Sequence, residues 1–257
     1  MGRVISIFNQ KGGVGKTTSV VNLAAALGKL NKRILVVDID PQGNATSGLG
    51  VDKNSLQKSI YNVMIDNADI KNIIYNTTAE NVYIAPSNVE LAGAEIELIE
   101  KEDRELVLKK AIEGIKDSYD IIFIDCPPSL GLLSINGLSA SDSVIIPIQC
   151  EYYALEGVSQ LMETIMLVKR GLNPQLEIEG VILSMFDGRT NLSIQVVEEV
   201  KKYFKGKVYT TIIPRNVRLA EAPSHGLSVI DYDAKSKGAE AYTELAEEFL
   251  YLLEEEI

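Results

Sequence analysis

The sequence predicts an α/β fold in which a mostly parallel central sheet carries helices on both faces. Short runs rich in valine and isoleucine alternate with longer helical stretches along the whole chain, which is the pattern of strand–helix–strand units. The apolar runs are nearly continuous, as expected of strands that are buried on both faces. No linker, repeat or low-complexity segment interrupts the alternation. We therefore expect a single domain over residues 1–257.

The predicted strands are six short apolar runs, which in chain order are Val4–Phe8, Ile34–Val37, Ile121–Ile124, Val144–Ile148, Val181–Ser184 and Val208–Ile213. Helices are predicted between and after them, at Thr17–Leu30, Glu95–Lys116, Leu155–Arg170, Asn191–Lys205 and Lys237–Leu253. The first helix has two breakers, Gly28 and Asn31, near its end. The stretch Tyr61–Tyr75 and its surroundings fit neither pattern, so we expect a peripheral insertion there and assign no role to residues 51–90.

The composition limits the classes of function. Apolar residues make up 46% of the 257 residues, which is enough for a substantial core. No run of about 18 apolar residues is present, so no segment is expected to cross a membrane. The first residues do not have the pattern of a signal peptide. The two cysteines, Cys126 and Cys150, fit a reducing compartment and are expected to be buried thiols, so we expect a cytoplasmic protein.

The charge is acidic in total but uneven along the chain. The formal net charge of −11 argues against a nucleic-acid partner, because like charge repels the phosphate backbone. Acidic residues concentrate at Glu95–Glu105 and Glu244–Glu256. Basic residues concentrate elsewhere, at Lys201, Lys202, Lys205, Lys207, Arg215, Arg218, Lys235 and Lys237. The sequence is therefore compatible with a local basic face, although such runs are ordinarily solvated surface.

A glycine-rich segment follows the first strand and opens the first helix, and it reads Lys11-Gly12-Gly13-Val14-Gly15-Lys16-Thr17-Thr18. Its glycines let backbone N–H groups turn inward around phosphate oxygens, and the helix N-terminus adds its positive dipole end. Lys16 is expected to reach the β- and γ-phosphates of ATP, and the Thr17 hydroxyl to ligate Mg²⁺. Gln10 stands where the standard pattern has its first glycine, and Lys11 is an additional lysine. The segment predicts a P-loop ATPase with a deviant Walker A motif.

Three aspartates follow two of the predicted strands. Asp38 and Asp40 end the second strand, and Asp125 ends the third. Ligands of open α/β sheets bind beyond the carboxyl ends of the strands, so all three aspartates are expected to converge on the phosphate loop. Asp125 fits the acidic residue that holds Mg²⁺ through its water shell. Because the period of two places Asp38 and Asp40 on one face, we assign metal support to Asp38 and orientation of the attacking water to Asp40.

No other catalytic chemistry is indicated. The single histidine, His225, lies in a Pro-Ser-His-Gly turn, so no Ser-His-Asp triad can be assembled and a structural role is expected. Cys126 follows Asp125 directly, and packing at the strand end explains it better than catalysis or iron–sulfur ligation.

Together with several longer motifs, these residues resemble the ParA/MinD group of P-loop ATPases, and within it the ParA (Soj-type) partitioning ATPases. The resemblance runs over nearly the whole chain. The stretches that carry it are Asn9–Thr18, Val37–Gly50 (VDIDPQGNATSGLG), Leu91–Leu98 (LAGAEIEL), Ile124–Leu133 (IDCPPSLGLL), Pro147–Gly157 (PIQCEYYALEG) and Ile213–Gly226 (IPRNVRLAEAPSHG). The resemblance implies a ParA-type, AAA/CbiA-like P-loop ATPase domain.

The resemblance also implies a cycle of assembly and release. ATP bridges a homodimer in which Lys11 reaches the phosphates of the partner subunit, and this dimer binds double-stranded DNA without sequence preference. A ParB-type centromere-binding protein stimulates slow hydrolysis of ATP, and the release that follows drives chromosome or plasmid partitioning on the nucleoid. Some Soj-type members also act on a replication initiator. The sequence identifies neither the replicon nor the ParB partner, and it does not show whether replication or transcription is also regulated.

Residue roles carry over from the family by position. Lys11, Lys16 and Asp40 serve hydrolysis. The residues of the loop that bind phosphate and Mg²⁺ are Lys11, Gly12, Gly13, Val14, Gly15, Lys16, Thr17 and Thr18. Two residues, Pro214 and Asn216, fall in the segment that resembles the adenine pocket. The residues that resemble DNA-contacting arginines are Arg189 and Arg218, with Arg215 a weaker candidate, and a surface ion pair is the alternative for each.

Two other classes remain open. A MinD-like regulator of membrane or protein targets is opposed by the acidic stretch Glu247–Ile257, which an anionic membrane would repel. A metabolic or metallocluster ATPase, such as dethiobiotin synthetase or the nitrogenase iron protein, is opposed by the setting of the two cysteines. The first strand begins by about Arg3, so no N-terminal helix-turn-helix that reads an operator is expected. The functional expectation rests on resemblance, since fold alone does not imply function.

Overall fold

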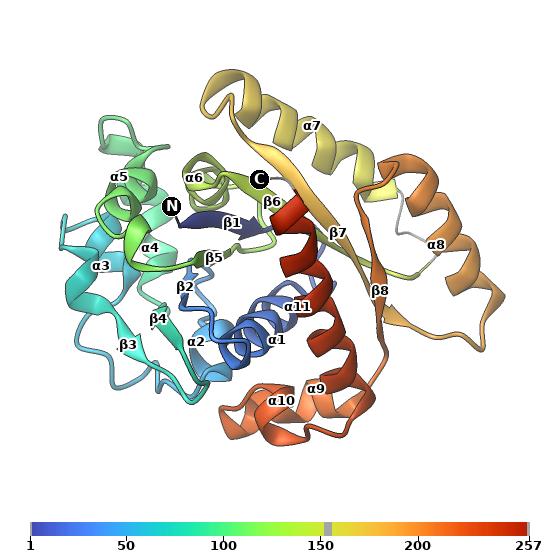
Figure 1. The fold of residues 1–257 in the computed structure, drawn as a ribbon. Coiled ribbons are helices and arrows are strands. Elements are labelled where there is room, and N and C mark those ends of the chain that lie inside the picture. The colour runs from blue at the N-terminus through green and yellow to red at the C-terminus, as the bar shows by residue number, and fades with distance from the viewer. Residues whose placement is uncertain (1, 152–155, 256–257) are drawn as a thin grey trace.

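One sheet forms the centre of the molecule (Figure 1). In this computed structural model, which describes residues 2–151 and 156–255, eight strands are hydrogen-bonded in the order β3-β4-β2-β5-β1-β6-β7-β8. The pair β3–β4 is antiparallel and the other neighbouring pairs are parallel, so the predicted fold class is confirmed. The strands are β1 (Arg3–Ile7), β2 (Ile34–Asp38), β3 (Tyr75–Asn76), β4 (Val82–Ala85), β5 (Ile121–Asp125), β6 (Ser143–Gln149), β7 (Glu177–Phe186) and β8 (Val208–Pro214).

Helices follow most strands and return the chain from the carboxyl ends of the strands to their amino ends. The α-helices are α1 (Lys16–Lys29), α2 (Asn44–Gly48), α3 (Ile60–Met64), α4 (Leu91–Glu97), α5 (Val107–Glu113), α6 (Leu132–Ala140), α7 (Glu156–Gly171), α8 (Asn191–Phe204), α9 (Val217–Glu221), α10 (Val229–Tyr232) and α11 (Lys237–Glu255). Short 3₁₀ turns are η1 (Ile70–Ile73), η2 (Leu98–Glu100), η3 (Lys116–Ser118) and η4 (Ala222–His225).

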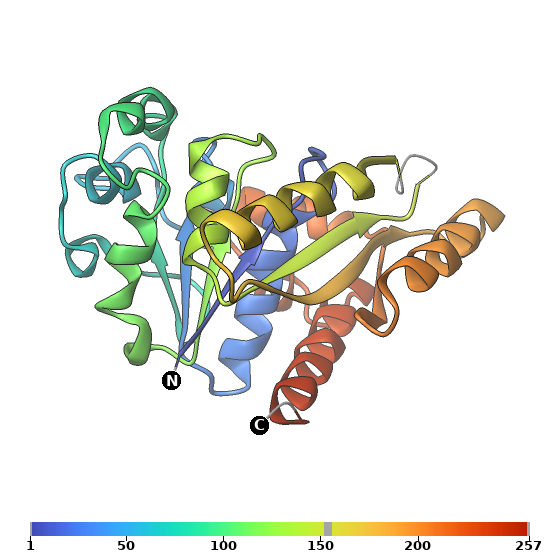
Figure 2. The same cartoon turned by 90° about the horizontal axis from the view of Figure 1, so that it is seen from above.

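Both faces of the sheet are covered. Ile5, Ile7 and Phe123 point into the core that contains α1 and α11, whereas Val4 and Ile122 point into the core that contains α4 to α8. Figure 2 shows α7 on one side of the sheet and α1 and α11 on the other. Alternate residues of each strand therefore meet apolar side chains on opposite faces, which explains why the strands read as continuous apolar runs.

The six predicted strands are confirmed to within a few residues, and four of the five predicted helices are observed. Leu155, the predicted first residue of the third helix, lies outside the described residues. The predicted helix Glu95–Lys116 is wrong, because α4 and η2 end at an extended Lys101, and Asp103 then takes a φ of 49°. A tertiary contact stabilises this break, since the side chain of Asn136 bonds the carbonyl of Arg104 at 2.7 Å.

The expectation of a peripheral insertion at Tyr61–Tyr75 is also wrong. This stretch belongs to α3, η1 and β3. Its apolar residues are buried in the same core as α4 and α5, and they include Val63, Met64, Ile70 and Ile73. The region therefore extends the sheet and its core, and its antiparallel strand β3 carries the chain from the carboxyl edge to the start of β4.

Candidate functional site

The glycine-rich segment lies between β1 and the first turn of α1. Gly13 and Gly15 have φ values of 75° and 94°, a left-handed conformation that favours glycine. A Cβ atom added at Gly12 or Gly13 would meet no atom of the described chain within 4 Å. No side chain caps α1 at Gly15, so the first N–H groups of this helix are available to an anion.

One hydrogen bond from β7 and one from Lys16 hold the backbone of this loop in place. The Ser184 hydroxyl of β7 donates to the carbonyl of Val14 at 2.8 Å. The Lys16 ammonium donates to the carbonyl of Lys11 at 3.1 Å, and Lys16 is only 7% exposed. Burial lowers the pKa of Lys16, while the nearby Asp125 raises it. The loop therefore presents a desolvated cation to whatever occupies it, which strengthens an interaction with phosphate.

A pocket of about 320 Å³ lies over the loop. Its lining brings together Gly12, Gly13, Gly15, Lys16, Thr17, Thr18, Asp40, Gln42, Asn44, Pro128 and Met185. Asp40 is 7% exposed, and its Oδ1 accepts a hydrogen bond from the Gln42 nitrogen at 2.9 Å. The structure thus places Asp40 with the predicted phosphate-binding residues in one concave site.

Asp125 is buried at the end of β5, and in the described part of the chain neither of its carboxylate oxygens has a hydrogen-bond partner. Burial raises the pKa of Asp125 well above its usual range, and the charge of Asp38 raises it further. The Thr17 hydroxyl opposes this shift by its proximity to the carboxylate, although it does not meet the geometry of a hydrogen bond. An unpartnered buried carboxylate is costly. A divalent cation held by Asp125 and Thr17 would relieve this cost, so the residues fit Mg²⁺.

Asp38 is held by three hydrogen bonds at the end of β2. Its Oδ2 accepts hydrogen bonds from the Thr46 nitrogen at 2.9 Å and the Thr46 hydroxyl at 2.7 Å, and its Oδ1 accepts one from the Asp40 nitrogen at 3.1 Å. Burial raises the pKa of Asp38 to about 6. β2 ends at Asp38, and Ile39 lies in the same core as Leu35 and Val37, so a shared face for Asp38 and Asp40 stays a prediction. The hydrogen bonds of Asp38 hold the turn at the end of the strand, and its role in metal binding also stays a prediction.

A second pocket, of about 240 Å³, adjoins the first. It contains the two predicted adenine-pocket residues, Pro214 and Asn216, and shares Gly15, Thr18 and Met185 with the phosphate pocket. Met185 was not predicted as a site residue, and it has a φ of 53° within β7. Backbone strain at a non-glycine residue tends to occur at functional sites. The sequence around Met185 contains no pattern that predicts this conformation.

The three predicted DNA-contacting arginines follow β7 and β8. The two strands are paired through Phe186 and Pro214. Arg189 binds the Asp187 carboxylate through Nε at 2.8 Å and Nη2 at 2.7 Å. Arg215 lies 3.2 Å from Glu151, and its charge also lowers the pKa of Asp187. Arg218 contacts two carboxylates, at 2.7 Å and 3.2 Å, which belong to Glu221 and Asp233. All three therefore lie at the edge that carries the phosphate loop, and each is paired with an acid.

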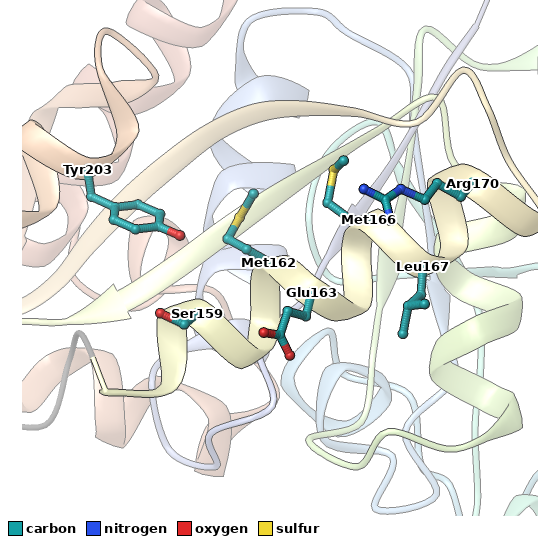
Figure 3. Close-up of a pocket in the computed structure, with 7 residues that line it drawn as sticks. All are labelled: Ser159, Met162, Glu163, Met166, Leu167, Arg170 and Tyr203. Carbon is teal, nitrogen blue, oxygen red and sulfur yellow. The ribbon is translucent and has the colours of Figure 1, made fainter.

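A third hollow, a groove of about 500 Å³, lies between α7 and α8. Figure 3 shows its lining, in which Tyr203 comes from α8 and the rest comes from α7: Ser159, Met162, Glu163, Met166, Leu167 and Arg170. The groove is larger than either pocket at the loop, but none of the predicted phosphate-binding residues or aspartates lines it. We therefore place the candidate site at the loop.

Other possible sites are weaker. His225 stacks on Tyr232, with ring centroids 4.9 Å apart, as its predicted structural role requires. Cys126 and Cys150 are buried free thiols. Within residues 2–151 and 156–255, no group of three histidine, cysteine or acidic side chains is placed to hold a metal ion. None of the helices in that part of the chain combines the length and apolar character needed to cross a membrane.

Comparisons with known proteins agree with this site. Residues 2–178 match the protein-family model of an AAA domain. Sporulation initiation inhibitor protein Soj of Bacillus subtilis (strain 168) is 62% identical over 248 residues, covering 96% of this chain and 98% of Soj. Chromosome-partitioning ATPase Soj of Treponema pallidum (strain Nichols) is 49% identical over 250 residues, covering 97% and 98%.

A solved structure extends the similarity to nucleotide-bound proteins. Cobyrinic acid a,c-diamide synthase from Mycobacterium smegmatis, with bound ADP and magnesium, has a TM-score of 0.85 and 39% identity, covering 96% of this chain and 93% of that chain. The similarities extend over nearly the full length of both chains in each pair.

Proposed function

The chain belongs to the AAA-domain family and, within it, to the Soj/ParA chromosome-partitioning ATPases, and on that premise we propose that it is an ATP-driven switch that binds DNA as a dimer. The observation that carries the ATPase part of the proposal is the phosphate pocket. There an open glycine loop and a desolvated Lys16 face Asp40 and lie beside Asp125, whose carboxylate has no hydrogen-bond partner in the described chain. The alternative is a MinD-like regulator with lipid or protein targets, which vesicle co-sedimentation would distinguish.

The proposed chemistry assigns a task to each residue of the pocket. Lys16 and the loop N–H groups bind the phosphates of ATP. Thr17 and Asp125 hold Mg²⁺, which, when bound, neutralises phosphate charge and favours attack at the γ-phosphate. Asp40 orients the attacking water, with its Oδ1 already fixed by the Gln42 nitrogen. The second pocket, which contains Pro214 and Asn216, receives the adenine. Thr18 and Met185 line both this pocket and the phosphate pocket.

The proposed dimer forms across the open side of the loop. Lys11 is exposed, while its own carbonyl holds Lys16. Its side chain is thus available to the phosphates bound by a second copy of the chain. A cation that contacts the γ-phosphate of the partner binds ATP better than ADP, so it couples dimerisation to the nucleotide state and stabilises transition-state charge.

The proposed DNA contacts are Arg189, Arg218 and Arg215. Support comes from their common position beyond β7 and β8 and from their exposure, which reaches 88% for the Arg189 side chain. Two copies of this edge would double the basic surface on one face of the dimer, and this local charge, rather than the net charge of −11 per chain, would attract the phosphate backbone. A ParB-type protein is the proposed trigger of hydrolysis, and the nucleoid is the proposed location.

The test is fluorescence anisotropy with a random DNA duplex, using Asp40→Ala protein with ATP, with ADP and without nucleotide. We expect binding only with ATP, because the substitution leaves ATP binding intact and stops hydrolysis. The affinity should fall with salt at a log–log slope of about −0.9 per phosphate contacted. Arg218→Ala should abolish it.

An ATP dimer of the same variant that binds no DNA, even at low salt, would contradict the DNA part of the proposal. ATP-dependent co-sedimentation with anionic vesicles would then favour the MinD-like alternative. Lys16→Ala serves as the control that removes nucleotide binding, or the dimer that depends on it.

A further inference from the structure

The first turn of α6 is capped from another helix. Gly131 precedes α6 and supplies no side-chain cap. Glu95 of α4 does so instead: its Oε2 lies 3.0 Å from the Leu132 nitrogen, and its Oε1 lies 3.4 Å from the Leu133 nitrogen. A carboxylate in this place satisfies orphan N–H groups and is attracted by the helix dipole. The beginning of α6 is therefore fixed by α4.

The beginning of α6 matters because the segment 126–131 joins it to Asp125. Pro128 of this segment forms part of the wall of the phosphate pocket. The Ser134 hydroxyl of α6 donates to the carbonyl of Ser129 at 2.5 Å. A displacement of α6 would therefore be transmitted to Ser129, the residue next to Pro128, as well as to the end of the segment at Gly131.

The stretch 87–95 is also hydrogen-bonded, through Thr46, to the end of β2. At its start, the Ser87 nitrogen donates to the Thr46 hydroxyl at 2.9 Å, and that hydroxyl donates to Asp38 at 2.7 Å. At its end, Glu95 caps α6. One short piece of chain is thus hydrogen-bonded to Thr46 of α2, which in turn holds Asp38 at the end of β2, and to the helix that follows Asp125.

We propose that Glu95 is a positioning residue for ATP hydrolysis, which holds the segment 126–131 against the phosphate pocket by capping α6. The inference rests on the proposed function, because it concerns the rate of the same reaction. Glu95 does not line the phosphate pocket, so it acts through α6 and the segment. Its loss should lower kcat and leave the binding of nucleotide nearly unchanged.

Gly131 offers a second way to disturb the same contact. A Cβ atom at Gly131 would lie 2.3 Å and 2.4 Å from the two Glu95 oxygens. The backbone of Gly131 is extended, with φ −118° and ψ −174°, which any residue adopts. Gly131→Ala should therefore expel the carboxylate without straining the backbone. In a Glu95→Ala background the added methyl group has room, and the same substitution should have no further effect.

The experiment compares ATP hydrolysis and nucleotide affinity of the full chain, with random duplex DNA present. Glu95→Ala and Gly131→Ala should each lower kcat by ~10- to 100-fold, the range expected of a small displacement in an active site. The dissociation constant of a fluorescent ATP analogue should stay within ~3-fold. Glu95→Gln should recover part of kcat, since its amide oxygen still accepts one hydrogen bond. The double variant should match Glu95→Ala.

Glu97→Gln is the matched control, because Glu97 lies on the same helix and its carboxylate bonds the hydroxyl of Tyr61. It should behave as wild type. Amide hydrogen exchange without nucleotide supplies an independent measurement: Glu95→Ala should speed exchange in residues 126–135, and Glu97→Gln should not.

The outcomes separate the two proposals. A wild-type protein that does not hydrolyse ATP would count against the proposed function. If the wild type does hydrolyse ATP, an unchanged kcat in Glu95→Ala would overturn this inference alone. An effect of Gly131→Ala that persists in the Glu95→Ala background would also overturn it. A loss of nucleotide affinity as large as the loss of kcat would overturn it too, because it would indicate a general structural role.

Discussion

Asp187 is the residue that restrains the most exposed of the predicted DNA-contacting arginines. Its carboxylate accepts two hydrogen bonds from the Arg189 guanidinium and one from the Arg189 nitrogen. These contacts lower the pKa of Asp187 to about 2. A carboxyl with a depressed pKa favours the folded state above its unfolded pKa, about 4, and this contribution is lost as the pH falls toward 2. The pair is therefore intact at every pH used for DNA binding.

We expect Asp187→Asn to strengthen the ATP-dependent binding of DNA by ~2- to 10-fold at ~0.1 M salt, because it removes a negative charge that competes with phosphate for Arg189. The asparagine oxygen can still accept from the Arg189 nitrogen, so the turn is retained. Asp103→Asn is the control: it changes the net charge equally and releases Lys110, which lies 2.8 Å away. Equal effects of the two substitutions in anisotropy titrations would mean that Arg189 does not contact DNA.

At the scale of helices and strands, Gly28 shows that a contact between two elements can decide which residue a helix requires. It lies inside α1, where glycine normally costs about 1 kcal/mol relative to alanine. Here a Cβ atom would lie 2.1 Å from the carbonyl oxygen of Glu80, just before β4. Gly28→Ala should therefore destabilise the protein by ~1–3 kcal/mol, as overpacking does.

The matched control is Gly157→Ala in α7, where a Cβ atom would meet no atom of residues 2–151 or 156–255 within 4 Å. This substitution should be neutral or stabilising by up to ~1 kcal/mol. Urea denaturation followed by circular dichroism measures both variants. A Gly28→Ala protein as stable as the Gly157→Ala protein would show that α1 moves away from Glu80 at little cost.

Elements with a local signal could be predicted from the sequence, and elements that depend on distant contacts could not. The loop that ends at Lys16 was predictable because its glycines, its lysine and its helix are contiguous. The break after α4 was missed because Asn136, far along the chain, bonds the carbonyl of Arg104. The start of α6 gave no capping signal because its cap is Glu95. The hydrogen bonds of Asp38 were not predicted, because their donor, Thr46, lies eight residues later in α2.

At the scale of the whole molecule, the sheet gathers every proposed contact at its carboxyl edge. The loop follows β1, Asp40 and Asp125 follow β2 and β5, and the arginines follow β7 and β8. A chain of net charge −11 can bind DNA only if this edge presents its cations together, and a dimer that closes over the loop would do so. Dimerisation is therefore the step on which the proposed function depends.

Gly12→Val tests that step. A Cβ atom at Gly12 would meet no atom of the described chain within 4 Å, and Gly12 is exposed, so the monomer should fold normally and bind ATP. The two added methyl groups point into the space that a second subunit would occupy. We therefore expect the ATP-dependent dimer, seen by light scattering with size-exclusion chromatography, to be lost.

Gly114→Val is the control, because a Cβ atom there also meets no described atom within 4 Å, and the residue follows α5, away from the loop. It should form the ATP dimer as the wild type does. A Gly12→Val protein that binds ATP and still dimerises would mean that the subunits do not meet over this loop, and the position proposed for Lys11 would then be wrong. A Gly12→Val protein that neither binds ATP nor dimerises would mean that the valine side chain clashes with the nucleotide itself. No atom of the described chain lies within 4 Å of a Cβ atom at this position to account for the loss.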